Sequence, residues 1–333
     1  MTVPPEPPQS GASHPGWRSM GRYLLALVAG AVTVPALFLL MLALLDPDET
    51  RPPPQFSNSL CVDEKLAAMR RSPPQNPDLL VVGSSVAWRH FNSPEAIALQ
   101  PGLQPYNAGF CGANIKQTEA VVGWMMGRLS SVKEVILIAS PVDFEHCNDQ
   151  TANSLFPAGF DITEADTFVF ADGSPLLYYL RYFDPMTLWR NGRGLEARRT
   201  DITSYGSLVT DKFGDGPIEP PGSRRLLYGA PQFDAACFAG LHRIGMDLRA
   251  RGISFHVAVT PLHPEWLRLY DQGGQVTATL DTAIREALAG TEGHFIKTRT
   301  GIEEAAFFDG IHLRWSYTDE FTRSLLAEVR PLG

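Results

Sequence analysis

The stretch Leu79-Leu80-Val81-Val82-Gly83-Ser84-Ser85 decides the fold class. Four consecutive apolar residues that end at a glycine are typical of a fully buried strand followed by a tight turn. Similar apolar runs occur at 135–139 and 255–259, with a weaker one at 104–108. Helical patterns fall at 114–126, 238–251, 275–288 and 316–326. Buried strands that alternate with helices predict an α/β domain with a parallel sheet covered on both faces.

Composition excludes several classes of protein. The chain has 333 residues, of which 44% are hydrophobic, so it is too apolar for a disordered chain and too long for a disulfide-stapled mini-protein. Its 28 basic and 36 acidic residues give a formal charge of −8, and no basic run offers a nucleic acid an electrostatic footprint. The histidines show no metal-ligand spacing. We therefore predict no nucleic-acid partner, no metal and no other cofactor.

An uncharged apolar segment lies near the N-terminus. Residues 23–45 carry no charge and span roughly 35 Å as a helix, against a hydrocarbon core of about 30 Å. The alternative, a cleaved signal peptide, usually has a shorter apolar region and a small-residue cleavage site, which Leu44-Leu45-Asp46-Pro47 is not. We predict a transmembrane anchor at 21–46. Arginines precede the segment and acidic residues follow it, which favours an N-terminus inside the cell.

The anchor divides the chain into four parts. Residues 1–20 have the composition of a disordered cytoplasmic tail, and residues 47–75 that of a linker. Residues 76–333 are then a domain outside the cytoplasm. Within it, residues 150–235 are rich in proline and lose the strand–helix rhythm, so they indicate an inserted lid or, alternatively, strands that the pattern hides. The four cysteines allow three pairings or none: Cys61, Cys111, Cys147 and Cys237.

Two segments carry residues suited to catalysis. Ser85 directly follows the first strand, on a turn that leads into a helix, where a hydroxyl lies at the carboxyl edge of the sheet. Near the C-terminus, Asp309 precedes His312 by three residues, a spacing that lets a carboxylate bond one imidazole nitrogen while the other takes a proton from a serine. Each segment alone is also compatible with an ordinary turn.

Taken in order, three blocks resemble the SGNH (GDSL-type) hydrolase superfamily. They are Gly83-Ser84-Ser85, Asn107-Ala108-Gly109 and Asp309-Gly310-Ile311-His312. The resemblance implies a flavodoxin-like three-layer α/β sandwich. It also implies that Ser85 is the nucleophile, His312 the base and Asp309 its orienter, with the backbone N–H groups of Ser85 and Gly109 binding the oxyanion. Possible substrate-lining residues are Ser84, Asn107, Asn114 and Asp143.

The sequence departs from that family at two positions. Ser84 stands where the family usually has Asp, a change associated with its membrane-anchored acyl-transfer members. In the third block, Ser140-Pro141-Val142-Asp143, Val142 stands where an Asn side chain usually donates to the oxyanion. Losing one such donor costs about 2.7–4 kcal/mol in known enzymes. Slow hydrolysis suits a transferase, which must protect its acyl-enzyme from water.

The architecture is similar to that of the D-alanyl-transfer proteins of teichoic-acid modification and, more loosely, of alginate O-acetylation proteins. The resemblance implies an acyltransferase in the cytoplasmic (inner) membrane with a periplasmic domain. It would act on a cell-envelope glycan beside a multispanning membrane acyltransferase. Two alternatives stay open: a carbohydrate or lipid esterase of the same fold, and a non-catalytic scaffold that binds a glycan or a membrane partner.

Overall fold

The centre of the protein is a five-stranded parallel sheet. In this computed structural model its strands are β1 (Leu79–Gly83), β2 (Pro105–Asn107), β3 (Glu134–Ala139), β6 (Ser254–Val259) and β7 (His294–Ile296). The strand order is β2-β1-β3-β6-β7, and all four pairings are parallel. The expected strands at 79–82, 104–108, 135–139 and 255–259 are confirmed, whereas the sequence pattern missed β7.

The structure describes only part of the chain. The described residues are 17–45, 51–57, 59–148, 162–170, 176–181, 183–186, 188–189, 192, 201–202, 208–210, 228–298 and 300–330. Most of the expected lid at 150–235 lies outside them, as does most of the expected tail. Within the lid region the described elements are α6 (Ile162–Phe170), α7 (Leu176–Arg181) and an antiparallel pair, β4 (Asp201–Ile202) and β5 (Leu208–Thr210).

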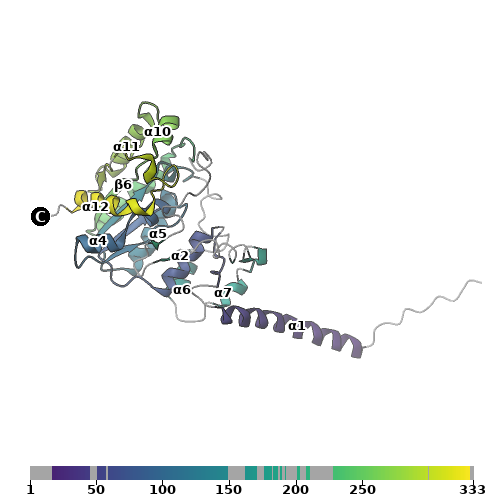
Figure 1. Ribbon diagram of the computed structural model, residues 1–333. Coiled ribbons are helices and arrows are strands. Elements are labelled where there is room, and N and C mark those ends of the chain that lie inside the picture. Colours follow the sequence, from purple (N-terminus) through teal and green to yellow (C-terminus); the bar gives the residue numbers. More distant parts are fainter. Residues whose placement is uncertain are drawn as a thin grey trace, which may run out of the picture.

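Helices cover both faces of the sheet, as predicted for an α/β domain (Figure 1). In β1, Leu80 and Val82 face one apolar cluster and Leu79 and Val81 face the other, all fully buried. The first cluster contains α2 (Leu60–Arg71), α5 (Ile115–Arg128), α6, α9 (Ala235–Ala250) and α11 (Gln275–Leu288). The second contains α3 (Ser85–His90), α4 (Ser93–Leu99), α10 (Pro264–Tyr270) and α12 (Thr318–Val329).

The strand order places a switch point between β1 and β3. The chain runs outward from β1 to β2 and then crosses back to β3 on the other side of β1. In doubly wound sheets, ligands bind in the crevice at the carboxyl ends of strands where the order reverses. The turns after β1 and β3 therefore form the natural place for a site.

The N-terminal helix α1 (Trp17–Leu44) runs away from the domain (Figure 1). Its stretch Met20–Leu44 is long and apolar enough to cross a membrane. Arg51 closes the helix, because its guanidinium donates to the carbonyls of Leu42 and Leu45 at 2.7 and 2.8 Å. A cation at this end also complements the helix dipole.

The expected linker at 47–75 requires a correction. The prolines at 52–54 and Phe56 are buried, and α2 contributes Val62, Leu66 and Met69 to the first apolar cluster. The carboxylate of Asp63 accepts hydrogen bonds from the backbone N–H groups of Phe56 and Ser57. Proline-rich composition suggested a spacer, but burial of this apolar surface packs the described part of the segment against the domain.

Two disulfides settle the open question of the cysteines. Cys61 pairs with Cys111 and Cys147 pairs with Cys237. The first bond joins α2 to the loop after β2, and the second joins the segment after β3 to α9. Both therefore fasten segments that adjoin the carboxyl edge of the sheet.

Candidate active site

The turn after β1 places a serine at the switch point. Gly83 has φ +134°, and a Cβ there would lie 2.1 Å from the carbonyl oxygen of Ile138, so only glycine fits. Ser84 is the N-cap of α3, and its side chain is 2% exposed. Ser85 is the first helical residue and is half-buried, so its hydroxyl remains reachable from outside. As the first residue of the helix, it also has a backbone N–H without an intrahelical acceptor.

A tight loop near the C-terminus carries Asp309 and His312. Phe307 and Leu313 form an antiparallel bridge that closes the loop. Within it, Oδ1 of Asp309 accepts hydrogen bonds from the backbone N–H groups of Ile311 and His312 at 3.0 and 2.8 Å. The spacing of Asp309 and His312 thus lets the backbone itself orient the carboxylate.

The loop brings Ser85, His312 and Asp309 into one chain of hydrogen bonds. The distance from Ser85 Oγ to His312 Nε2 is 2.7 Å, and that from His312 Nδ1 to Asp309 Oδ2 is also 2.7 Å. Burial alone would raise the pKa of Asp309, but His312 and the hydrogen bonds of the loop hold it below its usual range. An ionised carboxylate at Nδ1 keeps the proton there, so Nε2 can accept the serine proton.

His90, at the end of α3, positions this loop. Its Nε2 accepts the backbone N–H of Leu313 at 2.9 Å, so its Nδ1 carries the proton that is donated to Thr260 Oγ1 at 2.8 Å. Burial, with His312 nearby, holds the pKa of His90 well below its usual range. A neutral His90 therefore ties the helix that carries Ser85 to the residue that follows His312.

A second residue reaches the carboxylate from outside the loop. Tyr228 donates its hydroxyl to Asp309 Oδ2 at 3.0 Å, the same oxygen that bonds His312. The segment is fastened by Trp266, whose indole N–H donates to the carbonyl of Gly229 at 3.1 Å. Burial and the neighbouring Asp309 raise the pKa of Tyr228 above its usual range, so the phenol stays protonated and donates.

Ser84 and Asp143 bond each other, although both were expected as possible substrate-lining residues. Ser84 Oγ donates to Asp143 Oδ2 at 2.8 Å, and the same oxygen accepts the backbone N–H of Ser140 at 2.7 Å. Asp143 is 6% exposed, and burial raises its pKa to about 7. The pair joins the turn after β1 to the turn after β3. Val142, next to Asp143, is half-buried in the second apolar cluster.

The expected oxyanion donor Gly109 has its N–H directed elsewhere. That N–H donates to Asn107 Oδ1 at 3.0 Å, while Asn107 Nδ2 donates to the carbonyls of Ala87 and Trp88 at 2.8 and 3.2 Å. These partners fix which amide atom is oxygen, since a flip would oppose two donors. Asn107 is fully buried, so it fastens β2 to α3 rather than lining a pocket. Both expectations are corrected on this geometry.

Lys65 on α2 supports the same strand end. Its Nζ donates to the Asn107 carbonyl at 2.6 Å and lies 5.2 Å from the Trp88 ring centroid. The side chain is fully buried, and burial lowers its pKa well below the usual range. Together with the Cys61–Cys111 disulfide, this contact fixes the loop after β2 to α2.

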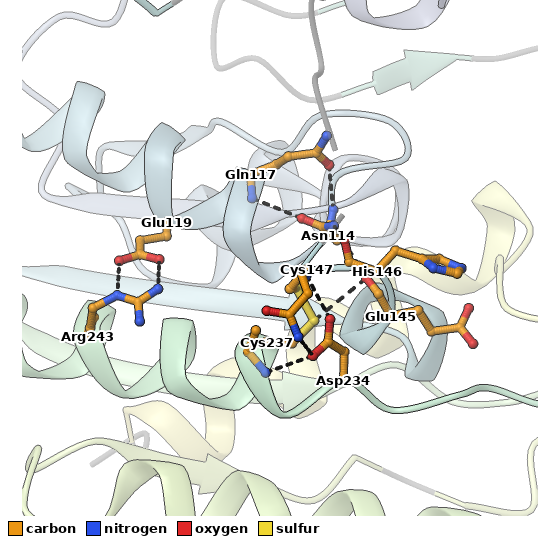
Figure 2. The surroundings of a disulfide bond; sticks show 11 residues. Asn114, Gln117, Glu119, Glu145, His146, Cys147, Asp234, Cys237 and Arg243 are labelled. Atoms are coloured by element: carbon orange, nitrogen blue, oxygen red, sulfur yellow. Dashed lines mark hydrogen bonds and ion pairs between the residues drawn. A yellow bond between two sulfur atoms is a disulfide. The ribbon is translucent and has the colours of Figure 1, made fainter. Parts of the chain in front are cut away.

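Asn114 is the N-cap residue of α5. It forms a capping box with Gln117 at the start of α5, and its amide donates to the carbonyl of Glu145 at 3.3 Å. Figure 2 shows it beside the Cys147–Cys237 disulfide, with Gln117 above it. Asn114 therefore joins α5 to the segment after β3, and a substrate-lining role for it stays a prediction.

Tyr228 and Lys65 are residues that the sequence analysis missed. Tyr228 lies 81 positions before its partner Asp309, and Lys65 lies 42 before Asn107. Neither stands in a motif, so only the folded chain reveals the contacts.

Within the described residues, no group of three or more His, Cys, Asp or Glu side chains is placed to hold a metal ion. No protein-family model matches the sequence, and no curated protein matches it.

Proposed function

We propose that this protein is a membrane-anchored serine acyltransferase that modifies a cell-envelope polysaccharide through an acyl-serine intermediate. The observation that carries the proposal is the pair of 2.7 Å distances that join Ser85 to His312 and His312 to Asp309. A nucleophile, a base and an orienting carboxylate in hydrogen-bond contact are the minimal machinery of acyl transfer. A scaffold without catalysis has no need for it.

The first half-reaction follows from the tautomer. Ser85 Oγ attacks the acyl carbonyl of an ester donor, and its proton moves to His312 Nε2. Asp309 stabilises the imidazolium through Nδ1. The tetrahedral adduct collapses as the donor's ester bond breaks, and the leaving alcohol takes the proton from Nε2. The products are an acyl ester on Ser85 and the released alcohol.

The second half-reaction reverses these steps with another alcohol. A glycan hydroxyl passes its proton to His312 Nε2 and attacks the acyl-serine carbonyl. Ser85 then leaves and takes the proton back, so the enzyme is regenerated. Water in place of the glycan would make the same residues an esterase, which is the alternative from the same fold.

Stabilisation of the oxyanion is the weaker part of the site. The backbone N–H of Ser85 lies at the start of α3, the positive end of the helix dipole. This position supports its role as a hydrogen-bond donor to the oxyanion. The Gly109 N–H is bonded to Asn107, and Val142 has no side-chain donor. Loss of one oxyanion donor costs about 2.7–4 kcal/mol of transition-state stabilisation. This deficit favours slow hydrolysis of the acyl-serine, which leaves time for transfer to an alcohol acceptor.

The N-terminal helix supports a location at a membrane. We propose that α1 anchors the chain in the cytoplasmic membrane with its N-terminus inside and the domain in the periplasm. The two disulfides support an oxidising compartment for the domain, since such bonds are rare in the cytosol. A multispanning acyltransferase that delivers acyl groups across the bilayer is the partner that this arrangement suggests.

The experiment uses the full chain in detergent, with a fluorophosphonate probe and a small acetyl ester. We expect labelling and ester cleavage in the wild type and their loss in Ser85→Ala and His312→Ala. Ser84→Ala is the matched control, because that hydroxyl bonds Asp143 and not the base. Glycan acceptors are then added: acyl transfer supports the transferase, and unchanged hydrolysis supports the esterase. Labelling that persists in Ser85→Ala would contradict the proposal.

A further inference from the structure

Large apolar side chains are exposed on one segment of the domain, between residues 176 and 189. We call it the α7 apolar surface and define it by Leu177, Leu180, Phe183, Met186 and Trp189. The first four are between 38% and 69% exposed, and Trp189 is 58% exposed. Large apolar side chains that are exposed together on one short segment are typical of an interaction site.

This surface lies beside the end of α1 that enters the domain (Figure 1). The rings of Phe183 and Phe38 meet edge to face, with centroids 5.3 Å apart. Near the same end of α1, Leu42 is 1% exposed, although most of the helix is exposed. The segment is also held to the chain that leaves α1, since the Tyr179 hydroxyl donates to the carbonyl of Pro52.

The position of Phe38 sets the depth of Phe183. Phe38 lies six residues before Leu44, or about 9 Å inside the end of α1. The candidate span of 25 residues is about 37 Å long, which exceeds a hydrocarbon core by about 7 Å. Even if the whole excess projects on this side of the bilayer, Phe183 lies at the edge of the hydrocarbon.

We infer that the α7 apolar surface inserts into the outer interface of the membrane, so that the domain rests on the lipid surface beside its anchor. The inference rests on the proposed membrane anchoring by α1. The occupant is lipid rather than a protein because the surface continues the exposed apolar side of α1 at the same depth. Tryptophan and exposed aliphatic side chains are the residues that favour this zone.

The domain then has a fixed orientation relative to the membrane. The described part of the linker is packed, Arg51 closes α1, and α7 contacts both α1 and Pro52. The domain therefore cannot swing freely about a tether. The substrate must reach Ser85 at a constant height above the lipid. This favours an acyl donor or glycan held at the membrane over a freely diffusing one.

The test is quenching of Trp189 fluorescence in the full chain. The protein is reconstituted into phosphatidylcholine vesicles with or without lipid that is brominated in the upper part of its acyl chains. The signal of Trp189 is the difference between the wild type and Trp189→Phe. We expect brominated lipid to quench this difference signal, and Leu177→Ser with Met186→Ser to weaken the quenching.

A matched control places a tryptophan on the opposite side of the domain. Arg268 on α10 has a side chain that is 63% exposed, far from α1 in Figure 1. Arg268→Trp in the Trp189→Phe background should show no quenching. An unquenched Trp189 in vesicles that retain the chain after alkaline extraction would overturn the inference and leave the surface to a protein partner. Catalysis plays no part in this readout, so failure of the acyl-transfer proposal stays distinguishable.

Discussion

On one side of Ser85, His312 and Asp309 stand in hydrogen-bond contact, and on the other side the Gly109 N–H donates to Asn107. The proton-transfer half of the site is assembled without substrate, whereas the oxyanion half has a donor engaged within the fold. The two halves are also built differently. A short loop orients the base, while the oxyanion half depends on packing among β2, α3 and α2. Under the proposed acyl-serine mechanism, we therefore expect hydrolysis to be limited by stabilisation of the oxyanion and not by the base.

The largest expected effect comes from the assembled half. Asp309→Asn keeps the shape of the loop but lets the imidazole adopt the other tautomer, with its proton on Nε2. We expect kcat for ester cleavage to fall about 10⁴-fold, as in other Ser-His-Asp sites. Steady-state kinetics on an acetyl ester measure this. A loss of less than tenfold would mean that the two halves do not differ as described.

A hydrogen-bond donor added to the oxyanion half of the site should raise the rate of ester hydrolysis. Val142→Asn restores the amide expected from the resemblance, and we expect hydrolysis of the acetyl ester to rise by about 10²-fold, near the lower limit for one oxyanion donor. Val142→Leu, which adds no donor, is the control and should leave the rate unchanged. Equal rates in both variants would contradict this prediction and show that position 142 does not limit the rate.

His90 tests the geometry of the base. His90→Phe keeps a ring against Phe321 but leaves the Leu313 N–H and the Thr260 hydroxyl without this partner. Each loss costs about 1–3 kcal/mol in stability, and displacement of the loop should lower kcat about 10–100-fold with little change in KM. Thermal unfolding and kinetics measure the two effects. Partial recovery in His90→Gln, which can accept from Leu313, would identify the positioning role.

Substitution of Tyr228 tests how the Asp309 carboxylate is shared between Tyr228 and His312. In Tyr228→Phe, Asp309 loses one donor, so more of its charge remains to stabilise the imidazolium. We expect the acid limb of the kcat/KM profile to move to higher pH by less than about one unit, the scale of one hydrogen bond. A lower rate with an unmoved limb would limit Tyr228 to packing.

Asp143 should give the smallest effect on activity, and its contribution should be visible in stability instead. Burial raises its pKa to about 7 from an ordinary value of 3.8. The folded protein holds a proton that the unfolded chain releases, so this group makes the free energy of unfolding fall as pH rises from about 4 to about 7. Asp143→Asn should remove this part of the slope. Denaturant titrations across that range would measure it, and parallel slopes in both proteins would contradict it.

The sequence predicted the parts of this protein that depend on local pattern. Apolar runs revealed four of the five strands of the parallel sheet, because buried parallel strands read as continuous hydrophobic stretches. The run 294–296 is too short, with a half-buried Phe295 and an exposed His294, to stand out as a strand. The prolines at 52–54 led to a wrong prediction, because a proline-rich composition is typical of a spacer whereas these residues are buried.

Prediction of the site followed the same rule. The spacing of Asp309 and His312 is local, and the structure places both at Ser85 as predicted. The partners of Gly109 and Asp309 that come from elsewhere, Asn107 and Tyr228, depend on rotamers and on distant chain segments. A sequence motif does not determine which acceptor a backbone N–H bonds. The hydrogen bonds around the expected oxyanion donors therefore could not be predicted from the sequence.

The separation of 227 residues between Ser85 and His312 orders events during synthesis. At about 5–20 residues per second, the ribosome completes the base on the order of 10–45 s after the nucleophile. If Ser85 and His312 act as proposed, a nascent chain that ends between them carries the nucleophile without its base. Under the proposed acyl-serine mechanism, a chain truncated before His312 is therefore inactive toward esters, whatever else of the domain has folded.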